Sequence, residues 1–134
     1  MRKPESIFWS RIKHLFEGLD PIRIEAETPL GVPDVNYKDG WVELKYVKEW
    51  PKRESTPLRL RHFTPEQRSF LSQREKSGGH AFLLLGVGEQ VLLFGGKLAG
   101  LYVGKYPRVL LHEIALRTWD SVREINIEEF QRCL

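Results

Sequence analysis

The chain has 134 residues, of which 41% are hydrophobic and 29% charged, and its formal net charge at pH 7 is +3. This length is typical of one domain, which we expect to span residues 1–134. The single cysteine, Cys133, excludes an internal disulfide and a thiolate zinc site. No apolar run reaches the roughly 18 residues of a transmembrane helix, and the first residues lack a signal peptide's apolar stretch. We therefore expect a cytoplasmic protein that does not enter membranes.

The first predicted helix covers residues 4–17, because apolar side chains recur there at helical spacing: Phe8, Ile12, Leu15 and Phe16. Glu5 falls on the same face. It either favours the helix dipole from solvent or points toward a buried site. Residues 22–27 then alternate apolar and polar, as in a half-buried strand, so Glu25 and Glu27 would face either solvent or a bound ion.

A β-hairpin is predicted around Asp39-Gly40, the dipeptide most favoured in two-residue turns. With these residues as the loop, Lys38 pairs with Trp41, and Asp34 pairs with Lys45. Alternation then separates an apolar face from a polar face. The apolar face holds Val35, Tyr37, Val42 and Leu44, and the polar face holds Asp34, Asn36, Glu43 and Lys45.

The polar face of this hairpin brings two carboxylates and an ammonium group within roughly 5 to 8 Å of each other at Cβ. That separation allows the carboxylates to share one divalent ion. The alternative is an Asp34–Lys45 ion pair on a solvated face, which contributes at most about 1 kcal/mol. Gly31 and Pro33 fix the backbone just before Asp34, which favours the functional interpretation.

These residues resemble a known family. Pro33-Asp34, followed after a hairpin by Glu43-Leu44-Lys45, is similar to the motif of the PD-(D/E)XK nuclease superfamily, in its phage and Holliday-junction-resolvase-like (VRR-NUC-like) branch. The run from Arg23-Ile24-Glu25 to Asp34 is similar to the form found in phage members. The resemblance covers roughly residues 4–88.

The resemblance implies an α/β fold with a restriction-endonuclease-like core, in which a mixed β-sheet is flanked by helices. It implies that Asp34, Glu43 and the backbone carbonyl of Leu44 hold Mg²⁺ or Mn²⁺, and that Lys45 is catalytic. Glu5 or Glu25 would complete the metal shell, directly or through water. The same resemblance leads us to expect a homodimer and a protein encoded by a phage.

A basic segment follows the predicted site directly, and we expect it to bind the DNA backbone. Its candidate DNA-binding residues are Lys48, Lys52, Arg53, Arg59 and Arg61. Trp50 in this loop either stacks on an unpaired base or plugs the edge of the core.

A second helix is predicted to begin at Thr64-Pro65-Glu66-Gln67, which has the pattern of a capping box. Gln67 either completes that cap or serves the site, where related nucleases carry a polar residue. The nearly continuous apolar runs at 80–87 and 90–94 predict central strands. Residues 95–105 are expected to form a glycine-rich connection, and helices are expected at 107–119 and at 127–134, the last capped by Asn126.

The sequence thus predicts a metal-dependent DNA endonuclease, with a preference for branched or junction DNA as one option. A catalytically inactive nucleic-acid-binding or assembly domain that retains the nuclease fold is the alternative. The four histidines are scattered, and the partial metalloprotease, dinucleotide and phosphate-loop motifs all lack required residues.

Overall fold

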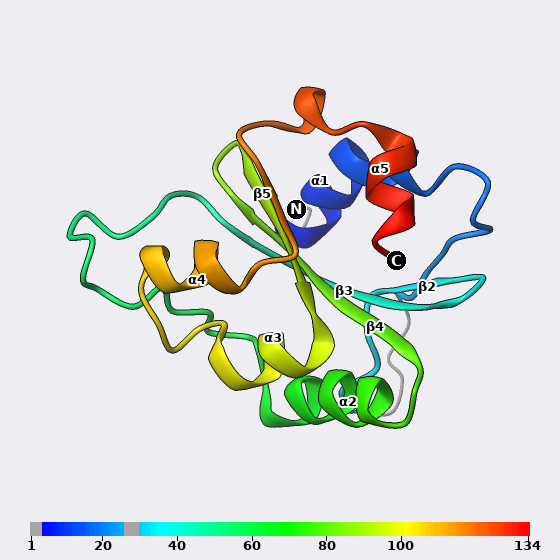
Figure 1. The fold of residues 1–134 in the computed structure, drawn as a ribbon, viewed down its shortest axis with the longest axis horizontal. Helices are drawn as coiled ribbons and strands as arrows, with labels where there is room; N and C mark the ends of the chain where they lie inside the picture. The colour runs from blue at the N-terminus through cyan, green and yellow to red at the C-terminus, as the bar shows by residue number, and fades with distance from the viewer. Residues whose placement is uncertain (1–3, 26–29) are drawn as a thin grey trace.

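The computed structural model describes residues 4–25 and 30–134. The fold is α/β, as predicted, with a six-stranded mixed sheet in the order β1-β2-β3-β4-β5-β6 (Figure 1). The strands are β1 (Ile22–Arg23), β2 (Val35–Tyr37), β3 (Gly40–Val47), β4 (His80–Val87), β5 (Gln90–Gly95) and β6 (Arg117–Trp119). The helices are α1 (Pro4–Ile12), η1 (Lys13–Phe16), α2 (Pro65–Lys76), α3 (Gly96–Tyr102), α4 (Arg108–Ile114), η2 (Val122–Glu124) and α5 (Ile127–Arg132).

Helices cover both faces of the sheet, with α1 and α5 on one side and α2, α3 and α4 on the other (Figure 1). Each layer has its own apolar cluster. The first combines Phe8 and Phe130 with the β3 residues Val42 and Leu44, and the second includes Leu71 of α2. Because side chains alternate along a strand, Glu43 and Lys45 face the second layer.

The parallel pair at the centre of the sheet is β3 and β4, which are joined by the crossover through α2. All other neighbouring strands are antiparallel. The predicted strands at 80–87 and 90–94 are confirmed, and they are buried on both faces from Ala81 and from Val91 onward. Glu43 and Lys45 therefore project from an interior strand of the sheet.

The predicted hairpin register is wrong by two positions. Val35 pairs with Val42 and Tyr37 with Gly40, so Lys38 and Asp39 form the loop. Gly40 belongs to β3 instead, because a Cβ there would lie 2.2 Å from the carbonyl oxygen of His80 on the adjacent strand. A slip of two residues leaves every side chain on its predicted face. Val35, Tyr37, Val42 and Leu44 are accordingly buried in one cluster.

The predicted strand at 22–27 is also wrong in extent and in facing. Only Ile22 and Arg23 pair with β2, and Ile22 is 54% exposed whereas Arg23 is partly buried. The guanidinium of Arg23 donates to the carbonyl oxygens of Ile24 and Asp34, which explains why the polar side chain turns inward. Glu27 lies outside the described residues. The predicted helix at 4–17 ends earlier as an α-helix and continues as η1.

The glycine-rich segment 95–105 contains α3, where a connection was predicted. Its glycines allow close contact with α2, because a Cβ at Gly96 would lie 2.6 Å from the Leu71 carbonyl oxygen and one at Gly100 would lie 3.0 Å from that of Arg68. The predicted helix at 107–119 is the shorter α4 followed by β6, which pairs with β5. The final helix and its Asn126 cap are confirmed. No helix in the described ranges is long and apolar enough to cross a membrane.

Candidate active site

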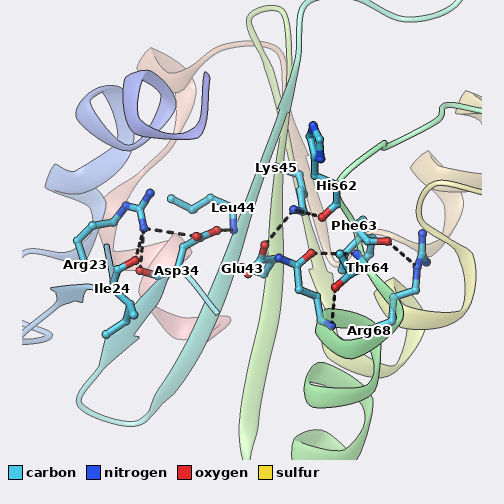
Figure 2. Close-up of polar contacts among 11 residues, drawn as sticks. Arg23, Ile24, Asp34, Glu43, Leu44, Lys45, His62, Phe63, Thr64 and Arg68 are labelled. Atoms are coloured by element: carbon cyan, nitrogen blue, oxygen red, sulfur yellow. Dashed lines mark hydrogen bonds and ion pairs between the residues drawn. The ribbon is translucent and has the colours of Figure 1, made fainter. Parts of the chain in front are cut away.

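Asp34 directly precedes β2, and it contacts both Arg23 of β1 and Leu44 of β3. Its Oδ2 accepts a hydrogen bond from the backbone N–H of Leu44 at 2.9 Å, and its Oδ1 lies 3.4 Å from Nη1 of Arg23 (Figure 2). Because β2 begins only at Val35, this carboxylate serves as the partner of a β3 amide that no β2 backbone group reaches. The side chain is thereby held beside β3.

The segment that leads into Asp34 is fixed against the start of α2. Gly31 has a φ of 88°, and a Cβ there would lie 2.4 Å from the carbonyl oxygen of Glu66. Only glycine accepts this backbone conformation together with this close contact. The predicted role of Gly31 in positioning Asp34 thus has a direct structural basis.

Glu43 and Lys45 form a buried ion pair. Their side chains are 2% and 7% exposed, and Nζ of Lys45 lies 3.2 Å from Oε2 of Glu43. The same Nζ donates to the backbone carbonyl of His62 at 2.8 Å (Figure 2). It also lies 5.8 Å from the centroid of the Phe63 ring. The structure therefore fixes the ammonium group between the strand and the loop that precedes α2.

The surroundings of Glu43 disfavour the ionised form of its carboxyl group. Burial, and after it the negative charge of Asp34, raises the pKa of Glu43 to about 8, while Lys45 acts in the opposite direction. Oε1 of Glu43 is buried and has no hydrogen-bond partner within the described part of the chain. A buried carboxylate oxygen in this state is costly unless a proton or a cation satisfies it.

The donor set fits a hard divalent cation. Asp34 and Glu43 supply carboxylate oxygens, and the carbonyl of Leu44 leaves β3 on the same side as the N–H that Asp34 binds. Mg²⁺ is often held by only one or two carboxylates together with waters and substrate phosphates. The orphaned Oε1 of Glu43 is the observation that supports this fit.

Among the described residues, no third acidic side chain joins Asp34 and Glu43 at the candidate metal site. Within residues 4–25 and 30–134, no group of three or more His, Cys, Asp or Glu side chains could hold a metal ion. Glu25 is exposed beyond the end of β1, and Glu5 lies on α1, which covers the sheet face opposite Glu43. The expected participation of Glu5 or Glu25 in the metal shell finds no support in this arrangement.

Gln67 completes the predicted capping box. Its Oε1 accepts from the Thr64 N–H, and its own N–H donates to Oγ1 of Thr64, both at 3.1 Å. This cap alone accounts for a glutamine at this position.

The basic residues predicted to bind DNA are all exposed, in the loop between β3 and α2: Lys48, Lys52, Arg53, Arg59 and Arg61. Trp50 of the same loop packs at the edge of the second apolar cluster. Its Nε1 donates to Oε1 of Gln90 at 2.6 Å, and the Arg108 guanidinium lies over its ring. The contacts of Trp50 thus support the core-edge interpretation over base stacking.

Arg23 belongs to this site, although the sequence predicted no role for its side chain there. Its Nη1 contacts both the carboxylate and the carbonyl of Asp34, and its Nε is buried without a partner among the described residues. The available signal was only that Arg23 occupies a polar position in the alternating segment 22–27, which was predicted to be a half-buried strand. Alternation alone could not show that the side chain curls back toward the carboxylate.

Neither a scan against protein-family models nor a search of curated proteins finds a match to this chain. The structure defines an α/β protein with a buried Glu43–Lys45 pair next to Asp34. Because no match was found, its membership of the nuclease superfamily stays a prediction.

Proposed function

We propose that this chain is a metal-dependent DNA endonuclease that hydrolyses phosphodiester bonds. The observation that carries the proposal is the buried Glu43–Lys45 ion pair beside Asp34, with one Glu43 oxygen left unsatisfied. Buried ion pairs are weak contributors to stability, because desolvation offsets most of the attraction. Such an arrangement is more readily understood as serving chemistry, and it matches the residues on which the resemblance to PD-(D/E)XK nucleases rests.

In this proposal Asp34, Glu43 and the Leu44 carbonyl would hold Mg²⁺ or Mn²⁺. When bound, the ion supplies positive charge for the phosphate oxygens and increases the acidity of a bound water. Glu43 would have to lose the proton that its raised pKa favours in order to hold the cation. Arg23 keeps the Asp34 carboxylate in place through its contacts with that residue.

Lys45 would supply the remaining catalytic group. Its ammonium is held by the carboxylate of Glu43 and by the carbonyl of His62, so it loses little freedom when substrate arrives. From this position it would stabilise negative charge that develops on the phosphate, or orient the attacking water. The exposed cations of residues 48–61 would contact neighbouring phosphates. Preference for branched DNA and formation of a homodimer have only the resemblance as their basis.

Cleavage assays with matched variants test the proposal. Asp34→Asn keeps an acceptor for the Leu44 N–H but removes the charge, and Lys45→Ala removes the ammonium. Glu124→Gln, at an exposed position in η2, is the control. Single-stranded, duplex, flap and four-way-junction DNAs are incubated with Mg²⁺ or Mn²⁺. We expect wild type and the control to cut at least one substrate and the two site variants to lose at least 100-fold in rate. Equal cutting by both site variants would refute the assignment.

A second candidate function is a nucleic-acid-binding domain without catalysis. It is favoured by one observation: Arg23 and Lys45 already offset the charges of Asp34 and Glu43 within the protein. In that case DNA binding persists in EDTA, and no substrate of the panel is cut with either metal.

A further inference from the structure

A cavity of about 310 Å³ lies beside the candidate active site, at the beginning of β3. Its volume is at the lower end of the range for small-molecule sites. Residues from β1, β2, the hairpin loop, β3, the last turns of α2 and the start of β4 line it, among them Asn36, Lys38, Asp39, Trp41, Arg74 and His80. None of these residues has a role in the function proposed above.

The cavity and the proposed catalytic pair share one face of the sheet. Trp41 lies two residues before Glu43 on β3, so both side chains project toward the α2 layer. Two residues of a strand span about 7 Å. A molecule bound against Trp41 would therefore lie next to whatever occupies the site at Glu43.

Aromatic and cationic groups are built into the wall of this cavity. The Trp41 ring packs edge-to-face on Phe70 of α2, with centroids 5.4 Å apart. The Arg74 guanidinium lies 4.7 Å from the Phe70 centroid and 6.0 Å from that of Trp41. Gly79 leaves room for the Arg74 side chain, because a Cβ there would lie 2.8 Å from Cδ.

Arg74 has no carboxylate partner among the residues that the structure describes. Its positive charge is therefore available to an anionic ligand. Lys38 and His80 add further donors, whereas Asp39 and the Oδ1 of Asn36 offer acceptors; the Asn36 amide nitrogen itself donates to the Gly40 carbonyl.

The aromatic, cationic and acidic side chains of the cavity wall together indicate which class of ligand fits it. A purely apolar molecule would leave the charged groups of the wall without partners. A bare anion would meet the carboxylates of Asp20 and Asp39, which also line the cavity. A nucleotide offers a π-face for Trp41, a base edge with donors and acceptors, and a phosphate for Arg74.

We propose that this cavity holds an unpaired nucleotide of the DNA substrate, next to the phosphate that is cut. The inference rests on the proposed nuclease function and defines its substrate class: DNA with a single-stranded segment beside the cleavage position. A fully paired base could not enter, because its face and edge are occupied by neighbouring bases in the duplex.

The test measures binding in EDTA, where no cleavage occurs. Fluorescence anisotropy gives the affinity for a blunt duplex and for the same duplex with a short single-stranded tail. We expect wild type to prefer the tailed duplex. Trp41→Leu should reduce affinity for the tailed duplex by roughly 5- to 100-fold, with little effect on the blunt one, and Trp41→Phe should retain most of the preference.

Arg74→Gln is the second variant, since Trp41 contributes to packing and its removal could impair folding. It should also reduce the preference for the tail. Arg132→Gln, an exposed position on α5, is the matched control and should leave the preference unchanged. Absence of a preference in wild type, or its survival in Arg74→Gln and in folded Trp41→Leu, would overturn the inference.

The outcomes separate this inference from the nuclease proposal. Tail preference that depends on Trp41 and Arg74, without Mg²⁺-dependent cleavage of any DNA, supports the cavity and rejects the nuclease. Cleavage that is lost in Asp34→Asn, together with tail preference unaffected by both cavity variants, supports the nuclease and rejects the cavity.

Discussion

At the level of single residues, Glu43 sets the properties of the site. Its side chain is 2% exposed, and its carboxyl group lies between an acidic neighbour, Asp34, and a basic one, Lys45. Burial and the charge of Asp34 together outweigh the attraction of Lys45, so the pKa of Glu43 rises to about 8. The folded protein therefore holds a proton on this group more tightly than the unfolded chain does.

The raised pKa of Glu43 predicts a pH dependence of stability. Between the ordinary pKa of 4.5 and the folded value of about 8, the folded protein binds a proton that the unfolded chain has lost. Glu43 thus stabilises the fold fully below 4.5, and this contribution is lost as pH rises through 8. In Glu43→Gln it is absent, so the stability of wild type relative to the variant should fall by at most about 1.4 kcal/mol per pH unit in that window.

Urea unfolding in EDTA across this pH range measures the difference. Glu113→Gln, an exposed position on α4, serves as the control and should follow wild type. Parallel stability curves for wild type and Glu43→Gln would contradict the assigned pKa.

At the level of elements, the site depends on how the segment before β2 is held against α2. Gly31 meets the Glu66 carbonyl directly, and Asp34 follows three residues later. The chain offers a matched comparison in Gly78, which has nearly the same φ, 86°, but no atom within 4 Å of a built Cβ.

We predict that Gly31→Ala is more destabilising than Gly78→Ala. Both substitutions place alanine in the left-handed region, at a cost of about 1–2 kcal/mol. Gly31→Ala adds a clash with backbone, which should cost about 1–3 kcal/mol more. Urea unfolding compares the two free energies, and cleavage by the folded fraction should fall more in Gly31→Ala. Equal destabilisation would show that the contact with α2 does not position Asp34.

The elements also show what the sequence could predict. Alternation fixed the two faces of β2 and β3 correctly, since a two-residue slip in register leaves facing unchanged. The register itself failed because Gly40 is required by the close approach of β4, a long-range contact that a local turn preference cannot reveal. The glycines of α3 were misassigned for the same reason: they serve packing on α2.

For the candidate site, the sequence placed Asp34, Glu43 and Lys45 on one face, and the structure brings these residues together. It could not predict the contact of Lys45 with the His62 carbonyl, seventeen positions away, or the inward turn of Arg23. Both depend on how loops close over the sheet. Glu5 shows a further limit of the sequence. Helical spacing predicts which face of α1 carries Glu5, but it cannot predict which face of the sheet α1 covers.

At the level of the whole molecule, positive charge gathers in the loop between β3 and α2. The exposed cations of this loop follow directly on the strand that carries Glu43 and Lys45. A substrate backbone that crosses the site would therefore meet the loop as well.

We predict that this loop determines the salt dependence of DNA binding. Replacement of Lys52, Arg53 and Arg59 by Gln should lower the slope of log K against log salt by up to about 2.7, if each contacts one phosphate. A control with the same loss of charge replaces the exposed residues Lys105, Arg123 and Arg132. Equal slopes for the two triple variants would show that net charge, and not the loop, drives binding.

The central claim is that Asp34 and Glu43 together bind a divalent cation. Isothermal titration of Mn²⁺ at pH 8 into wild type, Asp34→Asn and Glu43→Gln tests it directly, with the Glu124→Gln variant as control. We expect saturable binding by wild type and the control, and a loss of at least tenfold in affinity in each site variant. Binding of equal strength in all four proteins, or no saturable binding by wild type, would contradict the account.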